Sequence, residues 1–241
     1  LSEFLITDAK RYEAMIRFGT VSDTYDADGN VVPTGVEPVL DEDTVLKAME
    51  RFTGPITQRP PNYSALKIKG RKAYELARAG EEFEIPEREV MVYDFDLLEF
   101  NPPDIFVEVY CSSGTYIRSL AHDLGKELGC GAYLTELRRT KSGRFSMRQA
   151  VTLDELKKAF EDGDWYQYLI PAVESLHDFP EVVLDETLEL AIRHGQRVSV
   201  SGVEPNQDGY GKGISLQGEL VAILEYDKEG ESWKPKKVFL N

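Results

Sequence analysis

Val107-Glu-Val-Tyr-Cys-Ser-Ser-Gly-Thr-Tyr-Ile-Arg118 is the stretch on which the fold depends. Apolar residues alternate with others from Val107 to Cys111, which predicts a half-buried strand ending in a Ser-Ser-Gly turn. A helix is expected to begin near Thr115 and to stop at Gly129. Its predicted buried stripe consists of Ile117, Leu120, Ala121, Leu124 and Leu128. The stretch therefore predicts a strand that leads directly into a core helix.

Arg118 lies in the first turn of this helix, where the helix dipole already places partial positive charge. We therefore expect Arg118 to have an anionic partner. Two interpretations are open. Arg118 either forms a structural salt bridge, or it holds a catalytic carboxylate or a phosphate with its planar fork of guanidinium donors. Sequence spacing does not distinguish them.

The composition is that of a globular chain. The 241 residues are 41% hydrophobic, enough to bury a substantial core in one large domain or in a medium and a small one. No stretch approaches the roughly 20 apolar residues that a membrane span needs, and no signal peptide opens the sequence. A cytoplasmic protein without a membrane partner is expected. Cys111 and Cys130 are expected to be buried, reduced thiols, although sequence alone also allows a disulfide.

The distribution of charge matters more than its total. A formal net charge of −15 argues against nucleic acid as a partner, because phosphate binding usually leaves a basic signature. Two stretches nevertheless have a local balance of +4, residues 67–78 and residues 136–148. Eleven acidic residues gather between positions 149 and 192. These basic stretches are either ordinary solvated faces or a surface that steers a polyanion to one side of an acidic protein.

Three motifs, in order along the chain, resemble the TruB family of tRNA pseudouridine-55 synthases. The first is Lys10-Arg-Tyr-Glu-Ala14 with Phe18-Gly-Thr and Asp26, and the second is Arg59-Pro-Pro-Asn-Tyr-Ser-Ala-Leu-Lys67 with Gly70 and Tyr74-Glu-Leu-Ala-Arg78. The third is Gly114-Thr-Tyr-Ile-Arg118 with Asp123-Leu-Gly, Leu128-Gly-Cys-Gly-Ala132 and Leu137-Arg-Arg139. The resemblance runs from about residue 5 to residue 155 and is weaker near the C-terminus.

The resemblance implies an α+β fold with a mixed, mostly antiparallel sheet and flanking helices, the pseudouridine synthase fold. Residues 1–176 would form its catalytic domain, with a thumb-like insertion at about 59–86. Residues 177–241 would form a small β-barrel that resembles a PUA RNA-binding domain, although a generic small β-domain fits the same strands. The implied function is to isomerise uridine 55 in the T-arm loop of tRNA to pseudouridine, in a monomer that needs no obligate protein partner, cofactor or metal.

The resemblance also assigns roles to residues. Arg118 would be catalytic, and Tyr12 and Leu137 would contact the substrate base. Tyr116 would contact the substrate or the catalytic acid. The thumb residues Lys67, Lys69, Arg71 and Lys72 would bind tRNA phosphates. Without the resemblance, Tyr12 and Leu137 would be read as core residues of strands.

The family's nucleophilic aspartate lies in a Gly-Thr-Leu-Asp-Pro loop, a motif absent from these 241 residues. In the family, Leu1 corresponds to a position well inside the catalytic domain. We therefore expect this aspartate on a segment that is cut off, disordered or part of another chain, and we expect Arg118 to pair with it. This chain would then hold most of an active site without its essential carboxylate.

Periodicity predicts the other elements. Strands are expected at 10–18, 90–100, 105–111 and 133–137, and helices follow Asp41, Lys72 and the capping box Thr152-Leu-Asp-Glu155. A domain boundary is expected between Ile170 and Pro180. Beyond it, a helix at 185–194 and strands at 197–200, 213–217, 220–226 and 237–240 are predicted, the last pairing back across the turn at 227–230.

Other functions lack sequence support. His122, His177 and His194 show no zinc-ligand spacing, and the sequence holds no Gly-x-Ser-x-Gly, Walker A or Gly-x-Gly-x-x-Gly motif. Three alternatives to the synthase stay open. They are a non-catalytic tRNA-binding or tRNA-folding protein on the same scaffold, a dyskerin-like enzyme that works with guide RNA, and an acidic scaffold protein without RNA contact.

Overall fold

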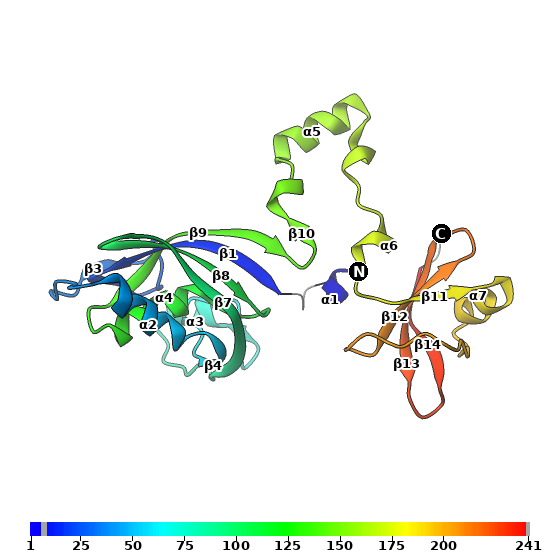
Figure 1. The fold of residues 1–241 in the computed structure, drawn as a ribbon, viewed down its shortest axis with the longest axis horizontal. Helices are drawn as coiled ribbons and strands as arrows, with labels where there is room; N and C mark the ends of the chain where they lie inside the picture. Colours follow the sequence, from blue (N-terminus) through cyan, green and yellow to red (C-terminus); the bar gives the residue numbers. More distant parts are fainter. Residues whose placement is uncertain (6–8, 240–241) are drawn as a thin grey trace. The chain divides into compact units, whose positions relative to one another are not determined.

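The computed structural model describes residues 1–5 and 9–239 of the chain. These divide into two compact units, one of Ser2–Ala150 and one of Val151–Asn241 together with Leu1. The units are coloured along the sequence in Figure 1 and are described separately here. The division falls at Ala150, before the expected domain boundary near residue 176, which stays a prediction.

The first unit is built on a six-stranded sheet in the order β10-β9-β1-β8-β7-β4. Every neighbouring pair is antiparallel. The strands are β1 (Lys10–Phe18), β4 (Gly54–Gln58), β7 (Arg88–Asn101), β8 (Asp104–Cys111), β9 (Ala132–Ser142) and β10 (Phe145–Ser146). The mixed α+β class with a mainly antiparallel sheet is confirmed.

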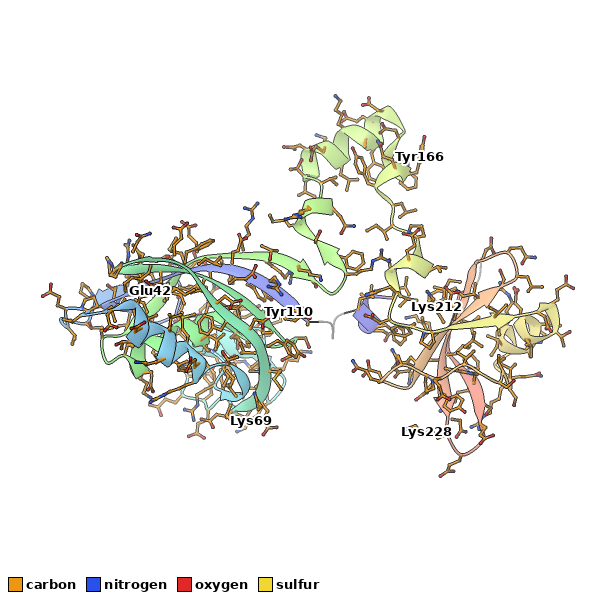
Figure 2. The ribbon with its side chains drawn as sticks, viewed as in Figure 1. Glu42, Lys69, Tyr110, Tyr166, Lys212 and Lys228 are labelled. Carbon is orange, nitrogen blue, oxygen red and sulfur yellow. The ribbon has the colours of Figure 1, made fainter. Side chains whose placement is uncertain are left out.

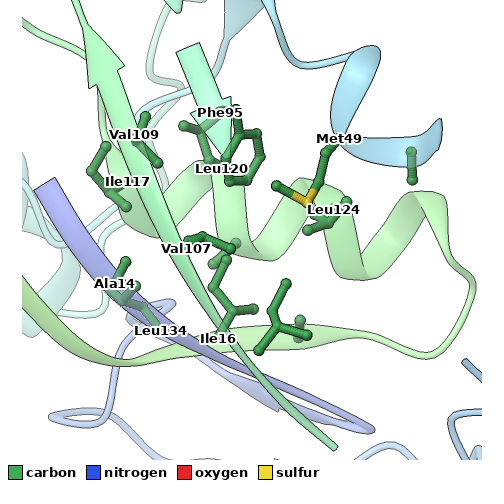
Figure 3. Close-up of a cluster of buried hydrophobic side chains, with 14 of the residues drawn as sticks. Ala14, Ile16, Met49, Phe95, Val107, Val109, Ile117, Leu120, Leu124 and Leu134 are labelled. Carbon is green, nitrogen blue, oxygen red and sulfur yellow. The ribbon is translucent and has the colours of Figure 1, made fainter. Parts of the chain in front are cut away.

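The opening stretch forms the centre of this unit. Strand β8 ends at Cys111, and helix α4 spans Ile117–Glu127, with Tyr116 as its N-cap residue. The predicted stripe is buried except for Leu128, which is partly buried, and Figure 3 shows Ile117, Leu120 and Leu124 against the strands. Full burial of such a side chain contributes about 1.5–3 kcal/mol, so this face of α4 anchors the unit.

The approach of α4 to the sheet depends on a glycine. A Cβ on Gly125 would lie 2.1 Å from the backbone N of Ala132, the first residue of β9. Any other residue there would push the helix away from the strand. Helix α2 (Glu42–Glu50) adds Val45 and Met49 to the same core, and its predicted cap is confirmed because the Asp41 side chain accepts a hydrogen bond from the Thr44 N–H.

The thumb-like insertion has its own small elements. Strands β5 (Lys67–Ile68) and β6 (Arg71–Lys72) form a hairpin, and helix α3 (Ala73–Arg78) follows directly. The two turn residues, Lys69 and Gly70, both have positive φ, which matches the right-handed twist of a tight hairpin. The short helix expected after Lys72 is confirmed.

The second unit holds a four-stranded sheet in the order β11-β12-β13-β14. Its elements are β11 (Glu181–Leu184), α7 (Glu186–Arg193), β12 (Tyr210–Ser215), β13 (Leu220–Asp227) and β14 (Ser232–Val238). Helix α5 (Leu153–Asp162), with its capping box at Thr152, and the short α6 (Ala172–Ser175) precede the sheet. The described residues do not form a closed barrel, so the PUA-like barrel is not confirmed.

Some predicted elements differ from the structure. Residues 197–200 form only an isolated bridge between Val198 and Trp233 rather than a strand. The last strand begins at Ser232, earlier than expected, and Leu240 lies outside the described residues. Strands β4 and β11 were not predicted. The remaining short elements are α1 (Ser2–Leu5), β2 (Thr20–Ser22) and β3 (Val31–Pro33), with single 3₁₀ turns at 147–149 and 165–168.

None of the helices in the described part of the chain combines the length and the apolar character needed to cross a membrane.

Candidate active site

A cavity of about 900 Å³ opens in the first unit, between the loop after β2 and the thumb-like insertion. The first turn of α4 lies at the same place. The lining residues are Asp23, Thr24, Asp26, Asp28, Gly29, Asn30, Tyr63, Ser64, Ala65, Tyr74, Arg78, Tyr116 and Arg118. Acidic groups, tyrosines and two arginines thus face one space.

Arg118 forms an ion pair in this cavity with Asp26, the aspartate of the first motif. Its Nη1 lies 2.7 Å from Oδ2 of Asp26, and both side chains are 21% exposed. The guanidinium also donates to two backbone carbonyls, that of Thr24 from Nη1 and that of Tyr63 from Nη2. Three hydrogen bonds therefore fix the orientation of the guanidinium beside the cavity.

The anionic partner expected for Arg118 is therefore Asp26, within this chain. Asp26 belongs to the first motif, but the partner of Arg118 was expected outside the 241 residues. The hydrogen bonds to described residues use three of the five guanidinium donors. Two donors of Arg118 have no partner among residues 1–5 and 9–239, so the geometry leaves room for a second acceptor. The additional upstream partner stays a prediction.

Asp26 is itself held from two sides. Its Oδ1 accepts hydrogen bonds from the Thr24 hydroxyl at 2.6 Å and from the Asp28 N–H at 3.1 Å, while Oδ2 faces Arg118. Both carboxylate oxygens are therefore occupied. This arrangement suits a fixed counter-ion better than a group that attacks a substrate.

Tyr116 is fixed by a buried glutamine. Gln58, at the end of β4 and 1% exposed, accepts from the Tyr116 N–H at 2.8 Å and donates to the Tyr116 carbonyl at 3.0 Å. The Arg88 guanidinium lies 4.7 Å from the centroid of the Tyr116 ring, a cation–π contact, and also donates to the Gly114 carbonyl. The backbone and the ring of Tyr116 are thus both positioned by the β4–β7 pair.

Another hydrogen bond joins α4 to the segment that follows β4. The Ser119 hydroxyl, buried in α4, donates to the Arg59 carbonyl at 2.8 Å. Together with the bond from Arg118 to the Tyr63 carbonyl, this tie anchors the beginning of the thumb-like insertion on the first turn of α4. The insertion thus starts from a fixed base beside the cavity.

The thumb contributes both cavity lining and exposed charge. Tyr74 and Arg78 of α3 line the cavity, and the Arg78 guanidinium lies 5.6 Å from the centre of the Tyr74 ring. The predicted phosphate-binding residues all lie exposed on or beside the β5–β6 hairpin. These are Lys67, Lys69, Arg71 and Lys72. Arg71 also pairs with Glu81 at 2.8 Å.

The structure does not bring all the predicted residues to one place. Tyr116 and Arg118 line the cavity, but the described lining includes neither Tyr12 nor Leu137. Tyr12 lies on β1 at the margin of the core, where burial raises the pKa of its phenol. Leu137 lies on β9, opposite Ala14, and is 47% exposed. Their role at the substrate base stays a prediction.

Several lining residues were not singled out from sequence. Tyr63 and Tyr74 were quoted in the second motif without a role, while Asp23 and Asp28 flank Asp26 in an Asp-rich turn. The signal that could have found the turn is its Asp-Thr-Tyr-Asp-Ala-Asp-Gly sequence, since Asp and Gly are typical of loops with side-chain to backbone bonds. Nothing in the spacing linked that turn to α4.

The described residues contain no group of three or more His, Cys, Asp or Glu side chains arranged to hold a metal ion. The described lining of the cavity instead combines an oriented arginine that keeps two open donors, three tyrosines and three aspartates. Such a site can orient an anion on Arg118 and contact a planar group with its aromatic side chains.

Family models define the class to which this fold and site belong. The model described as "TruB family pseudouridylate synthase (N terminal domain)" matches residues 1–117. The model described as "tRNA pseudouridylate synthase B C-terminal domain" matches residues 118–177. The class is therefore that of pseudouridylate synthases.

Similar proteins narrow the class to one family. The chain is 38% identical over 226 residues to the tRNA pseudouridine synthase B of Solibacter usitatus, a match that covers 93% of this chain and 77% of that protein. It is 44% identical to the protein of the same name from Burkholderia lata, with 93% of this chain and 67% of that protein covered. The chain belongs to the TruB family.

A solved structure shares the fold. It is a chain in the crystal structure of a Cbf5-Nop10-Gar1 complex, 26% identical, with a TM-score of 0.73. The match covers 99% of this chain and 68% of that one. Both units of this chain thus have counterparts in a known structure.

Proposed function

We propose that this protein isomerises a uridine of tRNA to pseudouridine, and that the uridine is number 55 in the T-arm loop. The observation that carries the proposal is the Arg118–Asp26 pair, which faces a cavity lined with tyrosines in a chain of the TruB family. The relatives named tRNA pseudouridine synthase B support the reaction and the substrate class.

The cavity suits a nucleotide turned out of its RNA stack. Its volume of about 900 Å³ lies within the range of small-molecule sites. Turning a base out of a folded RNA costs a few kcal/mol, and stacking on aromatic side chains offsets about 1–3 kcal/mol per base. Tyr116 and the thumb residues Tyr63 and Tyr74 are the aromatic groups available in the lining. Tyr12 and Leu137 would contact the base on its other sides after the substrate binds.

The reaction rearranges bonds without redox change. The bond between C1′ and N1 of uridine breaks, the uracil turns, and C5 bonds to C1′. C5 then loses its proton and N1 gains one. A carboxylate is needed to attack the sugar or base, and the closed site must exclude water from the detached uracil.

We assign that carboxylate to a Gly-Thr-Leu-Asp-Pro segment that precedes Leu1. Asp26 is a weaker candidate, because both of its oxygens already accept hydrogen bonds. The two open donors of Arg118 would bind the incoming aspartate and favour its ionised form. Arg118 would thus hold Asp26 and the nucleophile together.

Electrostatics would bring the tRNA to this face. The hairpin lysines and Arg71 are exposed and can approach phosphates, although the chain as a whole carries a formal net charge of −15. We further assign a PUA-like RNA-binding role to residues 177–241 and a catalytic role to residues 1–176. A monomer that acts in the cytoplasm without a protein partner completes the proposal.

The test is a tritium-release assay with the chain extended by its natural upstream segment. The substrates are tRNA transcripts that carry C5-tritiated uridine, and the control transcript has cytidine in place of uridine 55. Release from the first and not from the control is expected. Release from neither, with tRNA still bound, would replace the proposal with a tRNA-binding or tRNA-folding role. Salt-insensitive and negligible binding would indicate an acidic protein without RNA contact.

A further inference from the structure

Tyr25 has an unusual backbone conformation directly before the ion-paired Asp26. Its φ is +67°, in the left-handed region that residues other than glycine rarely adopt. Such strain persists only where the surroundings impose it, and it often marks a functional site. The strained residue is therefore adjacent to the counter-ion of Arg118.

Two backbone bonds and one ring hold Tyr25 in place. Its N–H donates to the Ser22 carbonyl, and its carbonyl accepts from the Leu134 N–H of β9. Its ring stacks on the imidazole of His122, with ring centroids 3.9 Å apart and an interplanar angle of 12°. Parallel stacking of this kind is favourable between aromatic side chains.

His122 lies one helical turn after Arg118, on the same side of α4. Two consecutive residues of the loop, Tyr25 and Asp26, therefore contact two side chains one turn apart on the helix. The first contact is a stack of rings and the second is an ion pair. The loop is attached to α4 at two points, which fixes its rotation as well as its distance.

His122 itself contacts the site through Tyr25. It is not among the described residues that line the cavity, and its Nδ1 is buried without a hydrogen-bond partner in the described part of the chain. The Tyr25 ring covers it. The stack with Tyr25 is therefore the contact through which His122 bears on Asp26 and Arg118.

We propose that the Tyr25–His122 stack is a positioning device that holds the Asp26 carboxylate in register with Arg118. The proposal rests on the proposed function, in which the open donors of Arg118 orient the nucleophile. Loss of the stack would let Tyr25 relax from its left-handed conformation and would turn the following residue, Asp26. Arg118 would then lose its fixed orientation while the substrate surface stays in place.

The charges around the stack agree with a neutral imidazole. Arg118 and Lys126 lie on α4 together with His122, and Asp123 directly follows His122 in the sequence. Asp26 approaches from the loop after β2, and Arg59 from the base of the thumb. Burial, and to a lesser extent Lys126, lowers the pKa of His122. Burial raises the pKa values of Tyr25 and Asp123. An uncharged ring therefore stacks beside Arg118 without adding a second cation.

The test compares conservative and disruptive substitutions in the upstream-extended protein. Tyr25→Phe and His122→Phe keep two stacked rings and should keep kcat near the wild-type value. Tyr25→Ala and His122→Ala should each lower kcat by roughly 100-fold with little change in KM, as expected for a small misplacement of a catalytic group. The double alanine variant should lose no more than either single one, because the rings act as one unit.

A second measurement reports on Arg118 directly. In nitrogen-15 NMR spectra, a guanidinium fixed by an ion pair shows separate Nη signals, because its rotation is hindered. The wild-type protein and Tyr25→Phe should show them for Arg118, and Tyr25→Ala should show one averaged signal. Phe160→Ala, which removes the separate Phe160–Trp165 stack, is the matched control and should change neither kcat nor this signal.

Two results would overturn the inference. One is a Tyr25→Ala variant with wild-type kcat and separate Arg118 signals. The other is an equal loss of kcat in Tyr25→Phe and Tyr25→Ala, which would assign the effect to the phenol hydroxyl. An inactive wild-type protein would instead count against the proposed function, and the NMR comparison would still decide whether the stack positions Arg118.

Discussion

Each unit of the molecule contains a well-shielded cation, and the two cations differ in what surrounds them. Arg118 in the first unit pairs with Asp26, keeps two donors open and faces a cavity of about 900 Å³. Lys212 in the second unit, labelled in Figure 2, is 7% exposed along its side chain. Its Nζ lies 3.2 Å from a Glu181 carboxylate oxygen and 3.3 Å from the Val173 carbonyl.

We expect Arg118 to have a functional role and Lys212 a structural one. Lys212 joins β12 to β11 and to α6, and it is absent from the described lining of the cavity. Arg118 also joins segments, since it bonds to Thr24 and Tyr63, but its remaining donors point to no described residue. Burial alone therefore does not identify a site. Open donors beside a cavity do.

The largest effect is expected from Arg118→Ala. Removal of the guanidinium leaves Asp26 without its counter-ion and the proposed nucleophile without its orienting donors. We expect kcat for tritium release to fall by roughly 1000-fold or more. Lys212→Met is the matched substitution in the second unit, and its kcat should stay close to the wild-type value. Comparable losses of kcat in the two variants would contradict the assignment of a functional role to Arg118 and a structural role to Lys212.

The next largest effect concerns the core of the second unit. Trp233 is fully buried, and a Cβ on Gly211 would lie 2.9 Å from its ring, so the fit is tight. Trp233→Ala should lower the free energy of unfolding of this unit by about 3–5 kcal/mol. Calorimetry should show the unfolding transition of the second unit at a lower temperature, with the transition temperature of the first unit unchanged. Trp165→Ala, at a 39% exposed position, is the control and should change little. A joint shift of both transitions would mean that the units unfold together.

Gln58→Leu tests the backbone tie in the first unit. The variant leaves the N–H and the carbonyl of Tyr116 without their partner in a buried place. The expected loss of unfolding free energy is about 1–3 kcal/mol, with a lower kcat because Tyr116 and Arg118 lose their anchor. Urea unfolding measures the first and tritium release the second. Gln167→Leu, at an exposed position, is the control. Equal changes of unfolding free energy and kcat in the two variants would argue against a role for the Gln58–Tyr116 hydrogen bonds.

The smallest effect is a pH dependence of stability. The pKa of His122 is lower in the folded state, because burial disfavours the charged ring. The unfolded state therefore binds more protons, and the stabilisation present above about pH 6.5 is lost as the pH falls toward the folded pKa. Urea midpoints should decline over this interval in the wild-type protein and less in His122→Phe. His194→Phe, at an exposed position, should follow the wild-type curve. The same dependence of the urea midpoint on pH in the wild-type protein and both variants would contradict the lowered pKa of His122.

The parts of the fold predicted from sequence are those with strong local patterns. Strand β1 was predicted with its observed ends, Lys10 and Phe18, because its apolar positions alternate. Helix α4 was predicted from its buried stripe, although it starts at Ile117 rather than near Thr115. Strand β4 was missed, since Gly54 and Pro55 are typical of a turn and the strand is formed by pairing with β7.

The site was less predictable because it depends on contacts between distant segments. The motif identified Tyr116 and Arg118, and both line the cavity. The partnership of Arg118 with Asp26 joins residues 92 positions apart, and no local pattern indicates it. The left-handed Tyr25 is equally hidden, since its conformation is imposed by β9 and by His122.

In the function proposed above, this chain supplies the binding and orienting groups of a uridine isomerase, and an upstream segment would supply the nucleophile. This division of roles is tested by single-turnover tritium release from one tRNA transcript, with the 241-residue chain and the upstream-extended chain at equal concentration. Intact mass confirms each N-terminus, and filter binding confirms that both bind tRNA. We expect release by the extended chain alone. Release by the 241-residue chain would contradict it and would make an aspartate of the cavity, with Asp26 first among them, the nucleophile.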